Sequence, residues 1–332
     1  MRCGMAFYQP PEWAPHSAVW IGFPSDPDVW LTPFAGAQEE VAAFARAVHA
    51  DGKGEEVRLV CADAAAVARA HALAGDFATI IEAPFWDVWL RDTGPIIVSD
   101  NETPLALDYK GNGWGGKYPS ALDDDIARLL CDHGGLRRET RDWVLEGGAI
   151  DADGAGLLVT TGQCLLNPNR NPSLSRRDIE ERLCDELGLT QVLWLGVGLV
   201  NDHTDGHVDN LARFVGPGVL ALPQASGPDD PNAAVFADAH ERAKDWPVKI
   251  VSLPSAGRHL DAAGEVVPAS HMNFYIGNAT VVVPTYGGAS DEAAVAAIAE
   301  LFPDRETVGV KANAVLTGGG SFHCISQQVP AL

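Results

Sequence analysis

The sequence predicts a mixed α/β fold built from a repeated unit, and three observations support this prediction. Stretches with helical periodicity alternate with short runs rich in β-branched and aromatic residues. Several of these runs come in pairs joined by glycine or asparagine turns, which is typical of β-hairpins. A polar residue stands at the start of each hairpin, at successive spacings of 54, 61, 66 and 51 residues; these residues are Asp92, Glu146, His207, Asn273 and Cys324. Such recurrence indicates a repeat of hairpin, helix and strand, and an ordinary mixed α/β domain is the alternative.

Helices are expected where apolar residues recur at the spacing of one helix face. The expected helices are residues 36–50, 63–74, 122–133, 175–187, 233–244 and 290–301. Ser175 and Ser290 are suitable N-cap residues, and Gly188 stands where a helix C-terminal cap belongs.

Strands are expected between these helices. Single strands are predicted at residues 57–61, 79–82, 192–195, 248–253 and 307–310. Hairpins are predicted from 94–98 with 105–109, 149–151 with 156–161, 208–215 with 219–222, and 273–276 with 280–284. If five such units surround one axis, the polar residues at the hairpin starts meet near one centre. No stretch of the chain has the composition of a long linker, so a single domain over residues 1–332 is expected.

The net charge of the chain indicates which kinds of molecule it can bind. The 332-residue chain has a formal net charge of −22, which repels a nucleic-acid backbone and attracts a small cationic molecule. An acidic surface also keeps a protein in solution, and that is the simpler explanation of the charge. Because no apolar run reaches the ~20 residues that span a bilayer, no membrane partner is expected.

The six cysteines are scattered through the chain, which has no C-x-x-C motif and no apparent secretion signal. We therefore expect reduced thiols and a cytoplasmic location.

One cysteine, Cys324, lies in the sequence TGGGSFHCISQQVP (residues 317–330). Three consecutive glycines allow the backbone to approach a ligand closely. A cysteine acts as a nucleophile in its thiolate form, which a positively charged neighbour favours. His323 is adjacent, but neighbouring residues of an extended chain point to opposite faces, so a distant histidine is the better acid and base. The alternative is that Cys324 is a small buried apolar residue.

A second polar stretch, NDHTDGHVDN (residues 201–210), places His203, Asp205, His207 and Asp209 at alternate positions. In an extended chain these side chains share a face and fit a zinc or manganese site. They also fit an acid–base histidine beside a carboxylate that binds a cation, or simply a polar loop.

Two further stretches carry carboxylates. In residues 83–98 (APFWDVWLRDTGPIIV), Asp92 follows large aromatic residues, an arrangement suited to a planar cation or to a loop that caps a strand. In residues 145–154 (LEGGAIDADG), Glu146 precedes two glycines and can orient a catalytic imidazole or face water.

These stretches, taken together, resemble the agmatine deiminases and the related bacterial-type peptidyl-arginine deiminases. The resembling motifs are WLRDTGP (89–95), EGG (146–148), DGHVDN (205–210) and GGGSFHCISQQVP (318–330), with PPEWAPHSAVWIGFP (10–24), NGWGGKY (112–118) and MNFYIGN (272–278). They run in family order over nearly the whole chain.

The resemblance implies a pentein fold, an α/β-propeller of five ββαβ units around a pseudo-fivefold axis, with neither metal nor organic cofactor. It assigns catalysis to Cys324, His207, Asp92, Asp209 and Glu146. It implies hydrolysis of agmatine to N-carbamoylputrescine and ammonia through a covalent thiouronium intermediate on Cys324.

In that reaction, Asp92 and Asp209 would bind the guanidinium group and His207 would transfer protons. Trp89 and Trp114 are suited to cover the apolar stem of the substrate, and an acidic pocket to bind its terminal amine. Asp205 is a further candidate for substrate binding. A homo-oligomer is compatible with the sequence.

The alternatives are a deiminase of peptidyl-arginine or of another guanidino compound, a metallohydrolase that uses His203, Asp205, His207 and Asp209, and a non-enzymatic pentein-fold binding protein.

Overall fold

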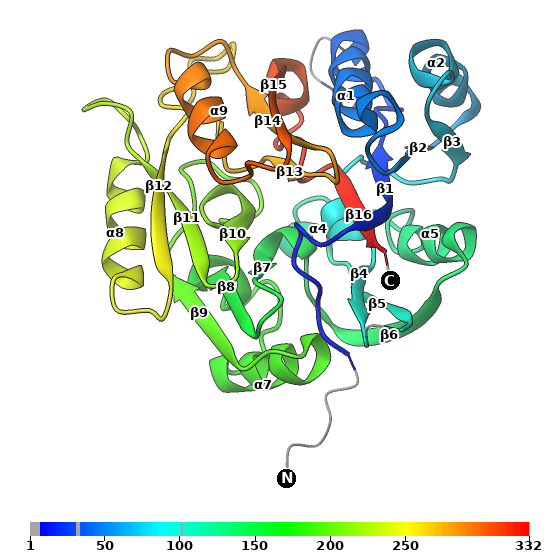
Figure 1. The fold of residues 1–332 in the computed structure, drawn as a ribbon. Coiled ribbons are helices and arrows are strands. Elements are labelled where there is room, and N and C mark those ends of the chain that lie inside the picture. Colours follow the sequence, from blue (N-terminus) through cyan, green and yellow to red (C-terminus); the bar gives the residue numbers. More distant parts are fainter. Residues whose placement is uncertain (1–6, 31–33, 101, 332) are drawn as a thin grey trace.

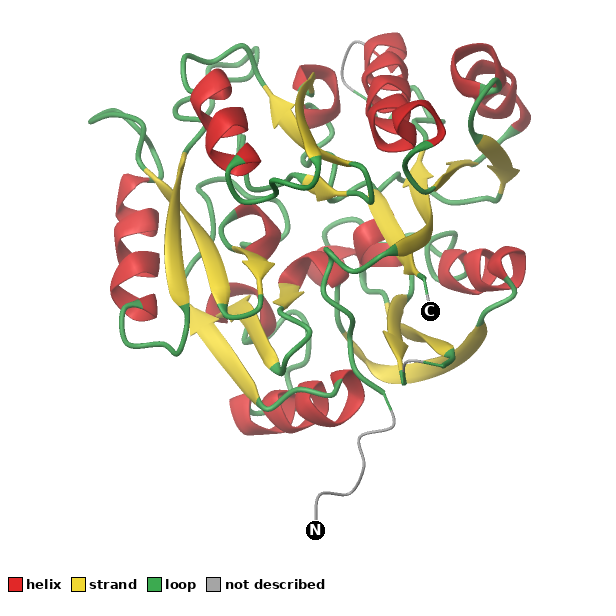
Figure 2. Ribbon diagram, viewed as in Figure 1, coloured by secondary structure: helices red, strands yellow, loops and turns green. Residues whose placement is uncertain are grey.

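The computed structural model describes residues 7–30, 34–100 and 102–331, so Cys3 lies outside the described residues. In this part of the chain, five small sheets surround a common centre and the long helices lie outside them (Figures 1 and 2). The arrangement has the five units that the repeat predicts and is the pentein architecture that the family resemblance implies. The described cysteines are free, and no described helix is long and apolar enough to cross a membrane.

Four of the sheets follow one plan, in which a hairpin of two antiparallel strands is extended by a third strand parallel to the second. The strands are β4 (Ile96–Ser99), β5 (Pro104–Lys110) and β6 (Arg137–Val144); β7 (Ile150–Ala152), β8 (Leu157–Thr161) and β9 (Gln191–Leu195); β10 (Arg213–Gly216), β11 (Val219–Gln224) and β12 (Lys249–Pro254); and β13 (Tyr275–Ile276), β14 (Thr280–Thr285) and β15 (Glu306–Lys311). The crossover helices are α5 (Ile126–Gly134), α7 (Arg176–Leu187), α8 (Ala233–Ala243) and α9 (Asp291–Ala299). Each unit is therefore ββαβ, because a parallel third strand requires a crossover connection.

The fifth sheet joins the two ends of the chain. Strand β16 (Ser326–Pro330) pairs antiparallel with β1 (His16–Gly22), and β1 pairs parallel with β2 (Glu56–Cys61) across helix α1 (Phe34–His49). Helix α2 (Ala64–Ala74) then leads to an additional strand, β3 (Thr79–Glu82). The last strand thus supplies the first strand of this unit, which closes the ring of sheets.

Short helical turns precede three of the hairpins and carry their polar residues inward. They are α3 (Leu90–Thr93), η2 (Gly147–Ala149) and η3 (Val208–Asn210). The prediction of a strand over 208–215 is therefore wrong in its first half. The backbone N–H groups of Leu211 and Ala212 donate to the Val208 carbonyl oxygen at 2.8 and 2.7 Å, so this segment is coiled and the strand begins at Arg213.

The remaining predicted helices and strands are present with small shifts at their ends. Strands β1, β6 and β16 were not predicted, nor were the short turns α4 (Gly113–Gly116), α6 (Gly162–Leu165), α10 (Asn313–Leu316) and η1 (Ala50–Gly52). Nearly every residue of β1 is buried. Its sequence therefore lacks the alternation of apolar and polar positions by which a half-buried strand is predicted.

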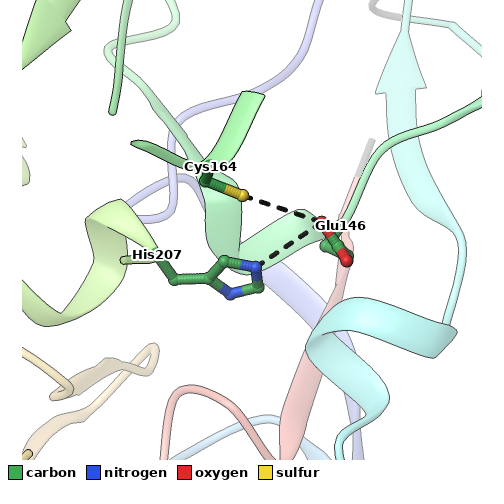
Figure 3. Close-up of side chains that lie close together, drawn as sticks. All are labelled: Glu146, Cys164 and His207. Carbon is green, nitrogen blue, oxygen red and sulfur yellow. Dashed lines mark hydrogen bonds and ion pairs between the residues drawn. The ribbon is translucent and has the colours of Figure 1, made fainter. Parts of the chain in front are cut away.

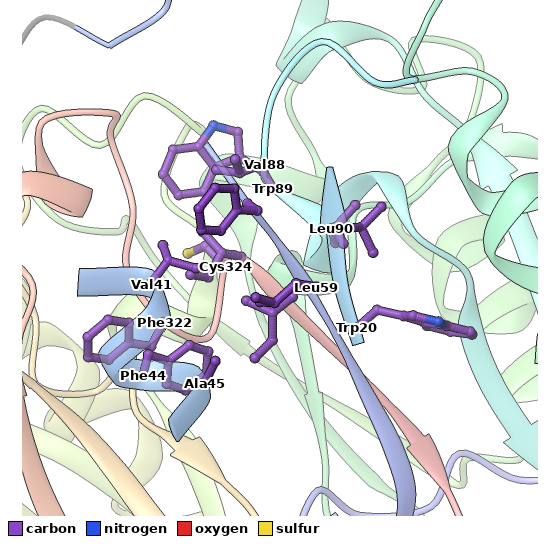
Figure 4. Packing of buried hydrophobic residues seen from close by; sticks show 14 of the residues in the cluster. Trp20, Val41, Phe44, Ala45, Leu59, Val88, Trp89, Leu90, Phe322 and Cys324 are labelled. Carbon is purple, nitrogen blue, oxygen red and sulfur yellow. The ribbon is translucent and has the colours of Figure 1, made fainter. Parts of the chain in front are cut away.

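The largest apolar core lies beneath the fifth sheet. Phe44 of α1 stacks on Phe322 with ring centroids 4.6 Å apart, and Trp20 of β1 is fully buried. Cys324 and Trp89 belong to this core (Figure 4). The loop that carries Cys324 is therefore fixed by apolar packing on one of its sides. The other side of the loop faces polar groups.

Candidate active site

Side chains from three different units meet close to Gly148, which belongs to a fourth. A Cβ atom placed on this glycine would lie 2.7 Å from His207 Nδ1, 2.9 Å from Asp92 Oδ1 and 3.1 Å from Asp209 Oδ2. Asp209 Oδ2 lies in turn 3.4 Å from Cys324 Sγ. The structure thus brings together the four residues that the sequence analysis placed at the centre of the site.

Cys324 is buried in the turn that follows the glycine triplet, and only 6% of its surface is exposed. The Asn273 amide nitrogen lies 3.1 Å from its sulfur, and the Asn273 amide oxygen accepts from the backbone N–H groups of His323 and Cys324. Burial raises the pKa of the Cys324 thiol well above its ordinary value, and the charges of Asp209 and Asp92 raise it further. The thiolate therefore requires a positive charge close to the sulfur.

Asp92 is fixed on both of its carboxylate oxygens. The Gly148 N–H donates to Oδ1 at 2.9 Å and the Trp114 indole N–H donates to Oδ2 at 2.8 Å. Burial nevertheless raises the pKa of Asp92; the His207 charge lowers it, and Asp209 and Glu146 raise it further. The carboxylate is oriented before any ligand binds. The charge of a bound cation would stabilise the ionised form of this buried carboxylate.

Asp209 has a different environment. Its Oδ2 accepts a hydrogen bond from His323 Nδ1 at 2.8 Å, while its buried Oδ1 has no hydrogen-bond partner among the described residues. Burial raises the pKa of Asp209, but the hydrogen bond and charge of His323 outweigh burial and lower it overall. Asp209 is therefore an ionised carboxylate with an acceptor oxygen available to a ligand.

His207 lies between two carboxylates. Its Nδ1 is 3.6 Å from Asp92 Oδ1, and its Nε2 is 3.6 Å from Glu146 Oε2 (Figure 3). Burial lowers the pKa of His207, but Asp92, Cys164 and Glu146 together raise it well above its ordinary value. The imidazole is consequently held protonated, in the state of a general acid.

Glu146 is held by a cation that the sequence analysis did not identify. Arg170 Nε lies 2.8 and 3.0 Å from the two Glu146 oxygens, and its Nη1 donates to Asp205 Oδ2 at 2.7 Å. The Arg170 side chain is fully buried, and burial raises the pKa of Glu146 while His207 and Arg170 lower it overall. Asn273, His323 and Glu12 were likewise not given a role. Each carried a signal in the sequence: Asn273 stands at the start of a hairpin, His323 is next to Cys324, and Glu12 lies in one of the motifs that resemble the family.

A cavity of about 540 Å³ opens over Cys324. Trp89, Trp114 and the glycine triplet form its walls, and the contact of the two tryptophans with a substrate stays a prediction. Close contact requires the glycines, because a Cβ atom on Gly320 would lie 2.6 Å from the Trp89 ring and 3.1 Å from Cys324 Cβ. The cavity is thus a slot with flat aromatic sides that ends at the sulfur.

The outer part of this cavity is acidic. Asp26, Asp28 and Asp87 line it with His203, and none of the described residues that line the cavity is lysine or arginine. Burial raises the pKa of Asp87 to about 7 although the Trp89 indole N–H donates to its carboxylate. An elongated ligand with a cationic end fits this wall better than one that ends in a carboxylate.

Asp205 was predicted to bind substrate, and the structure places it beside the cavity rather than in its lining. Its carboxylate lies 2.8 Å from Lys117 Nζ and accepts hydrogen bonds from Asn169 and Arg170. Asp205 therefore already has cationic partners, and its predicted contact with substrate has no support in the cavity lining.

The alternating residues of the stretch 201–210 do not form one ligand set. Asp205 and Gly206 have φ angles of 66° and 83°, which turn the chain sharply where an extended strand was assumed. As a result, His203 lies near Gly319, His207 faces Asp92 and Glu146, and Asp209 faces His323. The predicted metal centre of His203, Asp205, His207 and Asp209 is wrong for this geometric reason. Within the described residues, the group close enough to share an ion is Glu146, Cys164 and His207.

Taken together, a thiol, a protonated imidazole and two carboxylates face one end of a narrow slot. The carboxylates can bind adjacent N–H groups of a planar cation, and the thiol can then add to the central carbon.

Comparisons with known proteins point in the same direction. The sequence profile of the Porphyromonas-type peptidyl-arginine deiminases matches residues 8–330. An agmatine deiminase of Stutzerimonas stutzeri (strain A1501) is 38% identical over 98% of this chain and 96% of its own length. The structure of Enterococcus faecalis agmatine deiminase superposes with a TM-score of 0.91 at 32% identity, over 98% of this chain and 96% of that one. A C. jejuni agmatine deiminase with substrate bound has a TM-score of 0.91 at 26% identity, over 100% of this chain and 98% of that one.

Proposed function

Because the chain belongs to the Porphyromonas-type peptidyl-arginine deiminase family, we propose that it hydrolyses the guanidino group of agmatine to N-carbamoylputrescine and ammonia. The observation that carries this proposal is the convergence of Cys324, His207, Asp92 and Asp209 at one end of a slot whose other end is acidic.

The substrate cation activates the nucleophile in this proposal. The guanidinium group binds between Asp92 and the unpaired Oδ1 of Asp209, so its positive charge lies beside the Cys324 sulfur. That charge offsets the burial that raises the pKa of the thiol, and the thiolate forms as the substrate binds. The Asn273 amide donates towards the sulfur and stabilises the anion.

The chemistry then proceeds in two half-reactions. The Cys324 sulfur adds to the guanidinium carbon, His207 donates a proton to one nitrogen, and ammonia leaves. The amidino group remains bound to the sulfur as a thiouronium. His207, now neutral, removes a proton from water as the oxygen adds to the same carbon. The carbon–sulfur bond breaks, and N-carbamoylputrescine leaves. Glu146, fixed by Arg170, keeps the His207 ring in place.

The acidic outer wall favours agmatine over arginine. Agmatine is a cation at both ends, whereas the α-carboxylate of arginine would approach Asp26, Asp28 and Asp87. The tryptophan walls suit the apolar stem that joins the two cations. A peptidyl-arginine lacks the terminal amine and requires room for the peptide chain beside the aromatic walls.

The test is product analysis with three substrates. The purified protein is incubated with agmatine, arginine and an arginyl peptide, and ammonia and the ureido products are measured. Agmatine should give the highest kcat/KM, and Cys324→Ser should lower kcat by about 10³-fold or more because the covalent step is lost. A higher kcat/KM for the arginyl peptide or for free arginine would contradict agmatine as the substrate. Full activity of Cys324→Ser would contradict the mechanism.

We also infer that the chain is one catalytic domain, since the fifth sheet contains strands from both of its ends. The oligomeric state and the cytoplasmic location stay predictions.

A further inference from the structure

We propose that Glu146, Cys164 and His207 form an inhibitory binding site for a thiophilic divalent cation of the zinc type. The proton-transfer mechanism uses Glu146 and His207 but leaves Cys164 without a role. The three residues come from the EGG motif, helix α6 and the segment before η3, and their side chains point towards one another (Figure 3).

The distances between the three ligand atoms fit one metal ion. Glu146 Oε2 lies 3.6 Å from His207 Nε2 and 3.8 Å from Cys164 Sγ, and all three atoms lie within 4.8 Å of one another. In a tetrahedral zinc site with ordinary bond lengths, such atoms are about 3.3–3.6 Å apart. A small inward movement of the Cys164 and His207 side chains therefore completes three corners of a tetrahedron.

The ligand atoms are available and held in place. His207 Nε2 is buried and has no hydrogen-bond partner among the described residues. Arg170 fixes the Glu146 carboxylate from one side. Cys164 is held at the start of α6, where its backbone N–H donates to the Thr161 hydroxyl. Little conformational entropy is lost when such side chains bind an ion.

The surrounding charge accommodates a cation. Asp92, Glu146 and Asp209 are buried carboxylates near His207, and Arg170 is the opposing cation. Glu146 also lines a cavity of about 270 Å³ behind Trp114; the other carboxylates in its lining are Asp92, Asp108, Asp123 and Asp124. This acidic cavity offers a divalent cation a route to Glu146.

Binding changes protonation but not oxidation state. The metal ion takes a sulfur electron pair of Cys164 and a nitrogen electron pair of His207, and the thiol and the imidazolium each release one proton to solvent. A His207 ring bound to the metal through Nε2 keeps only its Nδ1 proton, and this neutral ring is a much weaker acid than imidazolium, so kcat falls while Cys324 and the substrate-binding carboxylates stay free.

Zinc inhibition tests the functional consequence. Agmatine turnover is measured against zinc chloride in buffer free of chelators and thiols, for the unaltered protein, Cys164→Ala, Cys164→Ser and the control Cys131→Ala, another buried cysteine. Each variant is compared with its own metal-free rate. Loss of a residue that only hydrogen-bonds to a metal ligand lowers metal affinity about 10–100-fold. Loss of the Cys164 ligand itself should therefore raise the zinc concentration needed for half-inhibition at least about tenfold in both Cys164 variants. Cys131→Ala should be inhibited like the unaltered protein, and EDTA should restore activity.

Direct binding tests the site independently of the proposed activity. Cadmium is titrated into Cys324→Ala, and the cadmium–thiolate charge-transfer absorbance is recorded; the signal should appear and should be lost in Cys324→Ala/Cys164→Ser. Absence of the signal in Cys324→Ala, or equal zinc inhibition of both Cys164 variants and the unaltered protein, would overturn the proposal. If no guanidino compound is hydrolysed but the cadmium signal depends on Cys164, the metal site stands and the proposed activity fails.

Discussion

His323 controls the charge of Asp209 although it does not contact substrate in the proposed mechanism. Its Nδ1 lies 2.8 Å from Asp209, and its Nε2 lies 2.7 Å from Glu12. An imidazole that donates from both ring nitrogens is positively charged. Burial raises the pKa of Glu12, but Arg213, His323 and Arg91 lower it well below its ordinary value, so both carboxylates are ionised. A residue near the N-terminus thereby holds the imidazole that lowers the pKa of Asp209.

Replacement of His323 by asparagine should therefore shift the acidic side of the pH profile. Burial raises the pKa of Asp209, and the hydrogen bond and charge of His323 lower it; without the His323 charge, the pKa of Asp209 moves up. The proposed binding of guanidinium requires ionised Asp209. When the pH is lowered, kcat/KM of the variant should therefore begin to fall at a higher pH than kcat/KM of the unaltered protein. The measurement is kcat/KM for agmatine against pH.

A control separates this effect from general damage. Glu39→Gln removes an exposed carboxylate of α1 that pairs with Arg69, and it should leave the profile unchanged. Thermal unfolding of both variants at neutral pH reports on stability. An unaltered acidic side of the profile in a folded His323→Asn protein would show that the charge of Asp209 does not depend on His323.

At the scale of single residues, sequence motifs could predict the reacting groups but not their supports. Cys324, His207, Asp92 and Asp209 stand in distinctive motifs, and the structure brings them together. Glu12 is 311 residues from His323 in the chain, and Arg170 is 24 residues from Glu146. Local spacing carries no information about such pairs, because they depend on how segments far apart in the chain fold together.

At the scale of elements, the short turns before the hairpins position the reacting groups. The turn η2 brings the Gly148 backbone within 2.9 Å of Asp92 Oδ1 and leaves no space for a side chain beside His207. Periodicity predicts long helices such as α7 well, since Ser175 and Asp178 form a capping box and Gly188 adopts the left-handed cap. It cannot predict three-residue turns, which contain less than one period.

Gly148→Ala should reduce turnover strongly with a smaller effect on stability. The new Cβ atom would lie 2.7, 2.9 and 3.1 Å from polar atoms of His207, Asp92 and Asp209, and these side chains must move. Because a displacement of ~1 Å can lower the rate about 10²-fold, kcat should fall by at least that factor. Steady-state kinetics and thermal unfolding measure the two effects.

The matched control is Gly216→Ala at the end of β10. There the nearest atom to a new Cβ would be a Val219 methyl carbon at 3.7 Å, which is ordinary contact. This variant should keep normal kinetics. If Gly148→Ala also turned over agmatine at a nearly normal rate, the close packing around this glycine would have no part in catalysis.

At the scale of the whole molecule, the repeat could be predicted and the closure of the ring could not. The recurring polar residues indicated a unit of 51 to 66 residues, and the four central units match it. The fifth unit pairs His16 with Pro330, which lie near opposite ends of the chain. No periodic pattern connects two such segments, although each lies in a stretch that resembles the family.

The net charge of −22 should make catalysis sensitive to salt. The field of an acidic protein with an acidic cavity mouth attracts a substrate with two positive charges and raises its rate of association. Salt screens this field, since the Debye length falls from about 30 Å at 0.01 M to about 3 Å at 1 M. Over that range, kcat/KM for agmatine should fall several-fold, to about tenfold, mainly through KM.

Arginine, which carries a carboxylate and a net charge of only one, provides the comparison under the same conditions. Its kcat/KM should change less with salt than that of agmatine. At long range the electrostatic field of the protein acts on the net charge of the substrate, and it distinguishes the separate charged groups of arginine only at short range. Sodium chloride and potassium chloride should give the same result, since screening depends on ionic strength and not on the identity of the cation. An agmatine kcat/KM that is constant or rises with salt would mean that substrate capture depends on contacts within the slot alone, and that the acidic surface acts only in solubility.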